Sequence, residues 1–377
     1  MTRRDARSAR DVRGYSVRVS DEPDDAEWDD FLEQARGSAY TQTSCWGRAR
    51  VSLGWRSVRV VVSEDDRVVA GAQIETRALP IGGLVGFVFG GPVVGDDRPE
   101  LVEVVLHEMM AMGKANKVRY LAVQPSRGDD RVCAELARSG FRRGVLDFLY
   151  IYHPASAILD LRIGADELAA KMSTSRRRNI RWAEKRGVTV RRGSEVDLPV
   201  LDRLEDAHAA RLGYARREDG YYTDLWRALA AREHVALFIA EYEGAPVCAQ
   251  LAIPFGDTSY HLERPWSGEH RELRATDVVE WEAIRWAKSE GYSFVDLGGI
   301  DPPVAEAVLS GTDHRDTREY GASLFKLRWG GQIITNPPFL DYVYNPVLRL
   351  GYRCVPRRLM RSAWMERLVK KLKETGS

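Results

Sequence analysis

A single lysine, Lys326, lies between apolar residues in the segment LFKLRW (324–329). The alternation of side chains predicts a strand, with Phe325 and Lys326 on opposite faces. A buried ammonium group there could stabilise negative charge that develops on an oxygen during acyl transfer. From the residues alone, a lysine that protects an edge strand from aggregation explains the pattern better. A catalytic role for Lys326 therefore depends on a second, independent signal.

A run of cations forms a second candidate site, this one for a polyanion. The run opens a predicted helix and comprises Arg176, Arg177 and Arg178, followed by Arg181, Lys185 and Arg186. Phosphate contacts dominate the affinity of proteins for nucleic acids, so an RNA backbone suits such a face. The ordinary alternative for a charge run is a solvated helix face. We expect Trp182, the aromatic residue within the run, to lie in the core.

Other catalytic chemistries lack their motifs. The seven histidines form no HxxxH or HExxH pattern and the four cysteines form no CxxC pair, so we expect no metal site. No GxSxG segment is present, and no cysteine has a recognisable histidine partner, so we expect no covalent nucleophile. Few, scattered cysteines are also typical of a reducing cytoplasm.

The composition is that of an ordinary globular protein. Of the 377 residues, 56 are Lys or Arg and 55 are Asp or Glu, and the net charge of +1 excludes a uniformly basic nucleic-acid coat. The longest apolar stretch, between Ala78 and Asp96, contains Pro80 and Pro92 and predicts strands and turns rather than a membrane span. Residues 1–13 have no apolar core, so we expect a disordered arm and not a secretory signal.

An internal repeat organises the elements that must position these candidates. Residues 60–74 (VVVSEDDRVVAGAQI) align without a gap with 237–251 (LFIAEYEGAPVCAQL), and each segment predicts a hairpin. Residues 112–123 align in the same way with 286–297, and each predicts the end of a helix followed by a buried strand. Two matches in the same order indicate a duplicated domain. We expect domains at 14–155 and 156–335, with the segment 336–377 packed on the first.

The repeated unit resembles the acetyltransferase-like (GNAT) fold. The predicted fold class is therefore α/β (α+β), with two tandem GNAT-like domains whose mixed sheets are flanked by helices. Simple members of that fold bind coenzyme A through an R/Q-x-x-G-x-G/A loop before a helix, where backbone N–H groups hold the pyrophosphate. The corresponding segments here, GGPVVGDDRPE and RPWSGEHRELRATD, do not fit that loop. We therefore expect no coenzyme A and no other cofactor.

Six segments along the chain match the motifs of one known family in their order. They are TQTSCWGRAR (41–50), GGPVV (90–94), RRRNIRWAEKRGVTV (176–190), RLGYARREDGYY (211–222), VDLGGI (295–300) and LFKLRWGG (324–331). Together they resemble the Fem family, the tRNA-dependent aminoacyltransferases that build peptidoglycan cross-bridges. One such match alone would be a weak signal. Some members carry a coiled-coil arm, but no heptad stretch is present here, so the chain resembles the armless members.

The resemblance implies roles for particular residues. It implies catalysis by Lys326 and Phe325, binding of the acceptor diphosphate and sugar by Arg50, Arg217 and Tyr221, a weaker substrate contact by Asp96, and tRNA binding by Arg176, Arg177 and Arg178. Arginine suits phosphate because its planar fork donates two hydrogen bonds. Arg217 and Tyr221 are four residues apart, which puts them on one face of a helical turn. Arg216 leaves a one-residue ambiguity, and a solvated arginine beside a core-edge tyrosine is the plain alternative. Asp96 has the alternative of a turn position.

The chain departs from the family pattern in the segment HLERPWS (261–267). The family shows Tyr-x-Tyr and Gly there, whereas this chain has Tyr260, Leu262 and Arg264. The departure indicates a different acceptor pocket.

The expected function is transfer of an amino acid from aminoacyl-tRNA to the amine of a peptidoglycan stem peptide, carried on lipid II or on a soluble nucleotide precursor. Three alternatives stay open: the same chemistry on a small-molecule antibiotic, an acyl-CoA N-acyltransferase, and a non-catalytic binder of muropeptide or RNA. We expect a cytoplasmic monomer at the inner face of the cell membrane. The basic amphipathic segment 349–373 predicts contact with an anionic membrane, a tRNA surface, or a terminal helix packed on the first domain.

Overall fold

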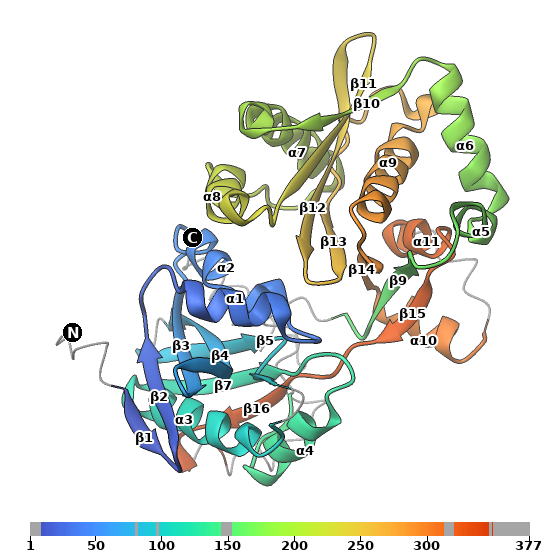
Figure 1. Ribbon diagram of the computed structural model, residues 1–377. Coiled ribbons are helices and arrows are strands. Elements are labelled where there is room, and N and C mark those ends of the chain that lie inside the picture. Colours follow the sequence, from blue (N-terminus) through green and yellow to red (C-terminus); the bar gives the residue numbers. More distant parts are fainter. Residues whose placement is uncertain are drawn as a thin grey trace. The chain divides into compact units, whose positions relative to one another are not determined.

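The structure is a computed structural model that describes residues 9–79, 82–95, 98–144, 153–312, 320–346 and 349. The chain forms two compact units, unit 1 from Met1–Tyr152 with Pro337–Ser377 and unit 2 from His153–Asn336 (Figure 1). Each unit contains a mixed sheet with helices packed against it, which confirms the predicted fold class. Asp96 and the basic segment beyond Arg349 lie outside the described residues, so the predictions for both stay predictions.

Unit 1 is built on one sheet in the order β1-β2-β3-β4-β5-β7-β16-β8, with β6 paired to β4. Its strands are β1 (Arg10–Val12), β2 (Tyr15–Ser20), β3 (Arg56–Glu64), β4 (Arg67–Ala78), β5 (Leu84–Phe89), β6 (Val93–Val94), β7 (Val118–Gln124), β8 (Arg142–Arg143) and β16 (Leu340–Val343). Its helices are α1 (Ala26–Gln34), α2 (Ser44–Ala49), α3 (Leu101–Ala115) and α4 (Asp130–Arg138). The strands β5 and β7 are parallel. β16 pairs with β7 and β8, so the chain returns to this sheet after unit 2.

The two faces of the first sheet bury different side chains. Period-two alternation puts Val60 and Val62 on the face that packs against α3 and α4. Val61 and Gly71 point to the other face, where Trp28 of α1 is fully buried. The close approach of Trp28 needs a glycine, because a Cβ atom at Gly71 would lie 2.7 Å from the indole. The second face thus carries the helices α1 and α2.

Unit 2 has a sheet in the order β10-β11-β12-β13-β14-β9-β15. Its strands are β9 (Ala155–Asp160), β10 (Thr189–Gly193), β11 (Ala236–Tyr242), β12 (Ala245–Phe255), β13 (Thr258–Glu263), β14 (Phe294–Ile300) and β15 (Gln332–Thr335). Its helices are α5 (Ala165–Lys171), α6 (Thr174–Lys185), α7 (Leu198–Leu212), α8 (Tyr221–Leu229), α9 (Ala275–Ser289), α10 (Pro302–Leu309) and α11 (Gly321–Leu327). The strands β13 and β14 are parallel.

The predicted internal repeat is confirmed. The two predicted hairpins are β3–β4 and β11–β12, and the two predicted helix–strand pairs are α3–β7 and α9–β14. The units differ where their parallel strands run side by side. In unit 1, β5 and β7 stay paired from Leu84 to Phe89, the whole length of β5. In unit 2, β13 and β14 pair only from Thr258 to Tyr260, and both strands then continue apart.

The predicted strand at LFKLRW is wrong, because these residues form the helix α11 and the turn after it. Four residues are too few for their apolar pattern to distinguish a helix from a strand. Here the contact between two residues that are four apart favours the helix. Phe325 and Trp329, four residues apart, pack edge to face with their ring centroids 6.0 Å apart. Phe325 and Lys326 are therefore neighbours around a helix and do not lie on opposite faces of a sheet.

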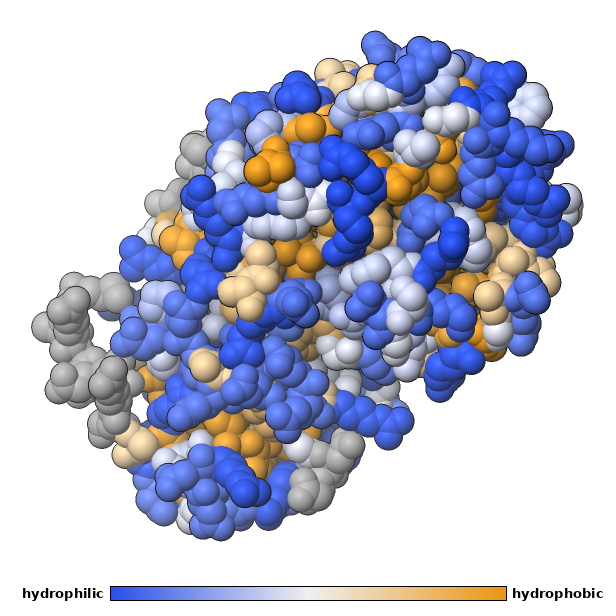
Figure 2. Space-filling view, turned by 45° about the horizontal axis from the view of Figure 1, so that its top comes forward, coloured by the Kyte–Doolittle hydropathy of each residue, from blue (hydrophilic) through white to orange (hydrophobic). Residues whose placement is uncertain are grey.

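The surface seen in Figure 2 is largely hydrophilic, with hydrophobic residues gathered in small, separate patches. Across the described part of the chain, no helix combines the length and the apolar character that a membrane span requires.

Candidate active site

Phe325 lies between two guanidinium groups in unit 2. The Cζ atoms of Arg176 and Arg264 are 3.9 Å and 3.7 Å from its ring centroid. Two guanidinium groups this close to one centroid would overlap on a single face, so they stack on opposite faces. Cation–π contacts of this kind contribute about 2 kcal/mol or more when they are shielded from water. The orientation of the Phe325 ring is thus fixed by charged groups from outside its own helix.

Two buried carboxylates of α9 compensate these arginines. Asp277 pairs with Arg176, and both side chains are 4% exposed. Glu280 accepts a hydrogen bond from Arg264 Nη1 at 2.5 Å, and its other oxygen lies 2.5 Å from Nδ1 of His261. Asp277 and Glu280 are three residues apart, so one face of the helix carries both. Burial by itself would raise the pKa of Glu280, but His261 and Arg264 outweigh it and hold that pKa at about 2.

Lys326 follows Phe325 and reaches the end of β14. Its Nζ atom donates a hydrogen bond to the carbonyl oxygen of Gly299 at 2.7 Å. Ser323 ties the same helix to the residue after β14, because its Oγ donates to Asp301 Oδ2 at 2.7 Å and accepts from Asp301 N at 2.9 Å. Burial, and next the positive charge of Arg264, lower the pKa of Lys326. A lysine ammonium has three donors, so N–H groups beyond the Gly299 bond can serve a bound oxygen.

The glycines at this point make the approach of Lys326 possible. Gly298 has a φ of +85°, a conformation that favours glycine. A Cβ atom there would lie 3.3 Å from Lys326 Nζ. The ammonium group therefore lies against bare backbone, just beyond Asp296, the last residue of β14 that pairs with β13. An ester carbonyl bound here would meet a partly desolvated cation, which is the arrangement that stabilises an oxyanion.

Arg217 and Tyr221 lie together, although not on one helical turn as predicted. Arg217 is in the loop before α8, and Tyr221 begins that helix. The guanidinium carbon of Arg217 is 5.2 Å from the Tyr221 ring centroid, and the side chain pairs with Glu263 at the end of β13. Arg216 instead pairs with the exposed Asp219. The contact with the sheet therefore distinguishes Arg217 from its neighbour.

The segment TQTSCWGRAR fixes the position of α2 in unit 1. The Gln42 side chain accepts a hydrogen bond from Gln73 N at 2.8 Å and donates one to the Phe89 carbonyl oxygen at 3.0 Å. Thr43 caps the helix, since its Oγ1 accepts from Trp46 N at 3.1 Å. Gln42 and Thr43 thus connect the start of α2 to the strands β4 and β5. Arg50, the capping residue directly after α2, is positioned through these contacts.

Arg50 lies against aromatic rings and a buried carboxylate. Its guanidinium carbon is 4.4 Å from the Trp55 centroid and 5.7 Å from that of Trp46. Its Nη1 atom is 2.6 Å from Oε2 of Glu75, whose side chain is 1% exposed. Burial raises the pKa of Glu75 to about 7, although Arg50 opposes that rise. An anion at this site would therefore have to share Arg50 with Glu75.

The three arginines predicted to bind tRNA have three different environments. Arg176 is buried against Asp277 and Phe325, which removes it from any surface for RNA. Arg177 Nη1 donates to the carbonyl oxygens of Ala169, Ala170 and Met172, at the end of α5, at 2.8–3.0 Å. Arg178 is exposed. The helix turns its successive residues by about 100°, so a run of adjacent cations cannot share one face.

Sequence reasoning missed the carboxylates that hold this arrangement together. Asp277 and Glu280 occur within the apolar run of α9, beside Val278, Val279 and Trp281. Acidic residues inside an apolar helical stretch are rarely left unpaired, and that is the signal that could have found them. Arg264 had a signal of its own, because it falls in the segment where the chain departs from the Fem pattern.

Two family models match the chain, one in each unit. A FemAB family model matches residues 24–133, and an acetyltransferase (GNAT) domain model matches residues 170–306. The lipid II:glycine glycyltransferase of Staphylococcus epidermidis is 22% identical to this chain over an alignment of 400 residues, gaps included. The alignment covers 87% of this chain and 94% of that protein. The resemblance to the Fem family is confirmed. The relative is a transferase by name, which supports a transferase here.

Solved structures show the same fold as this Fem-like chain. The crystal structure of FemX has a TM-score of 0.76 and 20% sequence identity, and covers 86% of this chain and 97% of its own. A tandem GNAT protein from the clavulanic acid biosynthesis pathway has a TM-score of 0.50 and 13% identity, and covers 88% of this chain and 99% of its own. In the Fem-like chain, the FemAB match contains Arg50 and Glu75, and the GNAT match contains the two arginines that enclose Phe325.

Proposed function

We propose that this Fem-like chain transfers an aminoacyl group from an aminoacyl-tRNA to the amine of a peptidoglycan precursor. The acceptor nitrogen forms a bond to the ester carbonyl carbon, and the bond from that carbon to the ribose oxygen breaks. The nitrogen loses a proton, and the ribose oxygen gains one. The observation that carries the proposal is the partly buried Lys326 ammonium against Gly298 and Gly299, where β13 and β14 part.

Lys326 has the properties that this reaction needs. Its positive charge would stabilise the oxyanion of the tetrahedral intermediate or the departing ribose oxygen. Phe325, enclosed by Arg176 and Arg264, would shape the wall beside the ester. An activated ester needs no covalent nucleophile, so positioning and charge stabilisation supply most of the catalysis.

The acceptor side of the proposal rests on Arg50, Arg217 and Tyr221. Both arginines already have carboxylate partners, Glu75 and Glu263. A bound diphosphate would therefore compete with those carboxylates or share the guanidinium groups with them, which is feasible because each guanidinium has five donors. The names of the relatives support lipid II as the acceptor.

A second candidate keeps the chemistry and changes the acceptor to a small molecule that carries an amine. Arg264 favours it, since this departure from the Fem pattern touches Phe325 directly. Transfer to the small amine, with lipid II inactive as acceptor, would decide for this candidate.

The test is a direct assay with a matched pair of variants. The purified chain is incubated with mixed aminoacyl-tRNAs and lipid II, and the acceptor mass is measured. Lys326→Met keeps the stem and removes the charge, and kcat should fall about 10²-fold or more with little change in acceptor affinity. Lys171→Met is the control, because Lys171 is half-exposed and pairs with Glu167 on its own helix. A Lys326→Met variant with wild-type kcat would contradict the proposal.

A further inference from the structure

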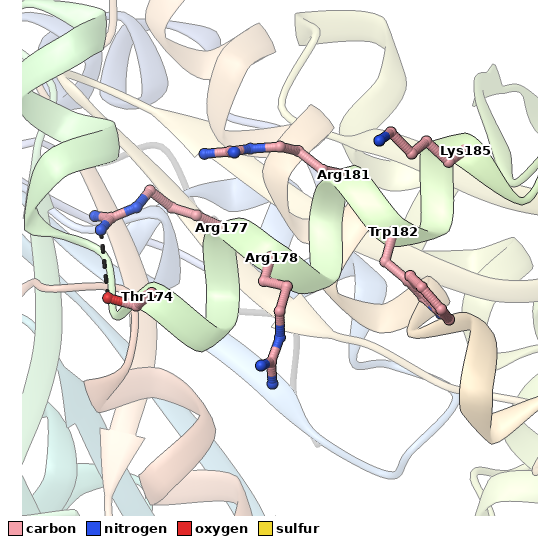
Figure 3. Close-up of a pocket in the computed structure, with 6 residues that line it drawn as sticks. All are labelled: Thr174, Arg177, Arg178, Arg181, Trp182 and Lys185. Carbon is pink, nitrogen blue, oxygen red and sulfur yellow. Dashed lines mark hydrogen bonds between the residues drawn. The ribbon is translucent and has the colours of Figure 1, made fainter.

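The helix α6 carries a shallow groove on its outer side. The groove is lined by Thr174, Arg177, Arg178, Arg181, Trp182 and Lys185 (Figure 3). The opposite side of the helix is buried and contributes Arg176, Ile180 and Ala183 to the interior of unit 2. The helix thus separates into an inner side that supports Phe325 and an outer side for which the reaction at Lys326 has no use.

The cations of the outer side form rows. Arg177, Arg181 and Lys185 recur every four residues and point to one side of the helix, whereas Arg178 and Trp182 point to another (Figure 3). Members of a row are separated by about 6 Å along the helix axis, from a rise of roughly 1.5 Å per residue. Arg177 is occupied by the carbonyl oxygens of α5, but Arg178, Arg181 and Lys185 present repeated positive charge along the groove, which suits a chain of phosphates better than a single anion.

These charges have no compensation within the described part of the chain. Among the residues described there, no carboxylate lies within ion-pair distance of Arg178, Arg181 or Lys185, and Glu184 is the one acidic residue of α6. Some other exposed arginines of unit 2 do have carboxylate partners, as in the pairs Arg162–Asp160 and Arg227–Glu195. In a chain with almost equal numbers of cations and anions, three uncompensated cations along one groove point to an anionic partner.

Trp182 adds an aromatic surface to this groove. The prediction that it lies in the core is wrong, because its side chain is on the outer side of α6 and the residue is 48% exposed. The guanidinium carbon of Arg186 is 4.4 Å from its ring centroid, so part of the indole is covered by a cation and the rest is open. A half-exposed indole among cations is the combination with which proteins stack a nucleic-acid base while they hold its phosphates.

We propose that the outer side of α6 binds RNA, with phosphates on Arg178, Arg181 and Lys185 and a base stacked on Trp182. This inference rests on the proposed function for the identity of the RNA, which would be the aminoacyl-tRNA donor. An anionic membrane fits the surface less well. A helix that lies in a membrane interface needs a broad apolar face, but Ile180 and Ala183 are buried and Trp182 alone is available for insertion.

The experiment measures binding of fluorescein-labelled, uncharged tRNA by fluorescence anisotropy over a series of salt concentrations. The triple variant Arg178→Gln/Arg181→Gln/Lys185→Gln should bind more weakly, and its log Kd against log salt should be flatter by roughly 0.7–0.9 for each phosphate that the variant no longer binds. Trp182→Ala should weaken binding about 10-fold, because a stacked base is worth ~1–3 kcal/mol, with a nearly unchanged salt slope.

The matched control is Arg203→Gln/Arg227→Gln/Arg285→Gln, which removes the same charge from exposed positions on three other helices of unit 2 and should bind like the wild type. Equal tRNA binding by the α6 triple and the wild type would overturn the proposal. The proposal would also be overturned if the α6 triple variant kept its tRNA binding and lost its binding to phosphatidylglycerol vesicles. The assay needs no turnover, so a chain that binds tRNA through α6 and yet transfers nothing would refute the proposed function and leave this inference intact.

Discussion

The Glu280→Gln substitution tests whether buried charge holds the catalytic segment in place. Glu280 joins His261 and Arg264, and its pKa of about 2 in the folded protein compares with an ordinary value of 4.5. A carboxyl whose pKa falls by this much on folding contributes roughly 3 kcal/mol to the free energy of unfolding, since each pKa unit corresponds to about 1.4 kcal/mol. Because the folded pKa is the lower one, this contribution is present above about pH 4.5 and is lost as the pH falls toward 2.

The substitution leaves the partly buried Arg264 without its buried counter-ion. Removal of one partner from a buried ion pair costs about 3–5 kcal/mol. For a unit of this size we expect the melting temperature to fall by roughly 6–20 °C, at about 2–4 °C per kcal/mol. Arg264 also stacks on Phe325, so kcat should fall even under conditions in which the variant is fully folded.

The assay is urea denaturation followed by tryptophan fluorescence, repeated between pH 2 and pH 8. Glu282→Gln is the matched control on the same helix, because Glu282 is 32% exposed and pairs with Arg285 one turn away. The control should stay within about 0.5 kcal/mol of the wild type. If Glu280→Gln were as stable as the control at pH 7, or if its loss of stability in acid matched that of the wild type, the electrostatic reasoning would be refuted.

Two further predictions concern unit 1. The pKa of Glu75 is raised to about 7 in the folded state, so its contribution to the free energy of unfolding is present below pH 4.5 and is lost as the pH rises through 7. In urea titrations of the wild type, the free energy of unfolding should therefore decline by roughly 3 kcal/mol between pH 5 and pH 8, and Glu75→Gln should remove this decline. A decline that persists in the variant would contradict the assignment. Gly71→Ala should destabilise by about 1–3 kcal/mol, because the new methyl group meets Trp28 and the Val60 carbonyl oxygen, and a melting temperature equal to that of the wild type would show that the core can yield there.

The repeated framework could be predicted from the sequence because its signals are local and regular. Apolar runs that flank an acidic turn specify the hairpins β3–β4 and β11–β12, and the turn of the first, at Asp65 and Asp66, has the positive φ values of a tight hairpin. The secondary structure of the short segment that carries Lys326 was harder to predict. Residues 324–329 are too few for the period to separate helix from strand, and the decision came from the packing of Phe325 on Trp329.

Side-chain environments could not be predicted where they depend on distant parts of the chain. Arg176 and Arg178 are two residues apart in a basic run, yet one is buried and the other exposed. The difference comes from Asp277, about a hundred residues later, which gives Arg176 a partner inside unit 2. Trp182 was expected in the core because tryptophan usually is, and only the orientation of α6 reveals that it is not.

The two units differ in how far their parallel strands stay paired, along all of β5 in unit 1 and only from Thr258 to Tyr260 in unit 2. The repeat aligns Gln124 at the end of β7 with Gly298 near the end of β14. In unit 1 the Gln124 carbonyl oxygen accepts hydrogen bonds from Gly90 N at 2.8 Å and Gly91 N at 3.2 Å, which holds the ends of β5 and β7 together.

In unit 2 the glycines of VDLGGI end that pairing. The register of β14 against β9 shifts between Asp296 and Gly299, and the positive φ of Gly298 turns the backbone at this point. The Gly299 carbonyl oxygen accepts a hydrogen bond from Lys326. The segment that closes the sheet in one copy thus binds an ammonium group in the other, through the residue that follows the aligned position. This exchange gives a physical reason why the cation proposed for catalysis lies in the second unit.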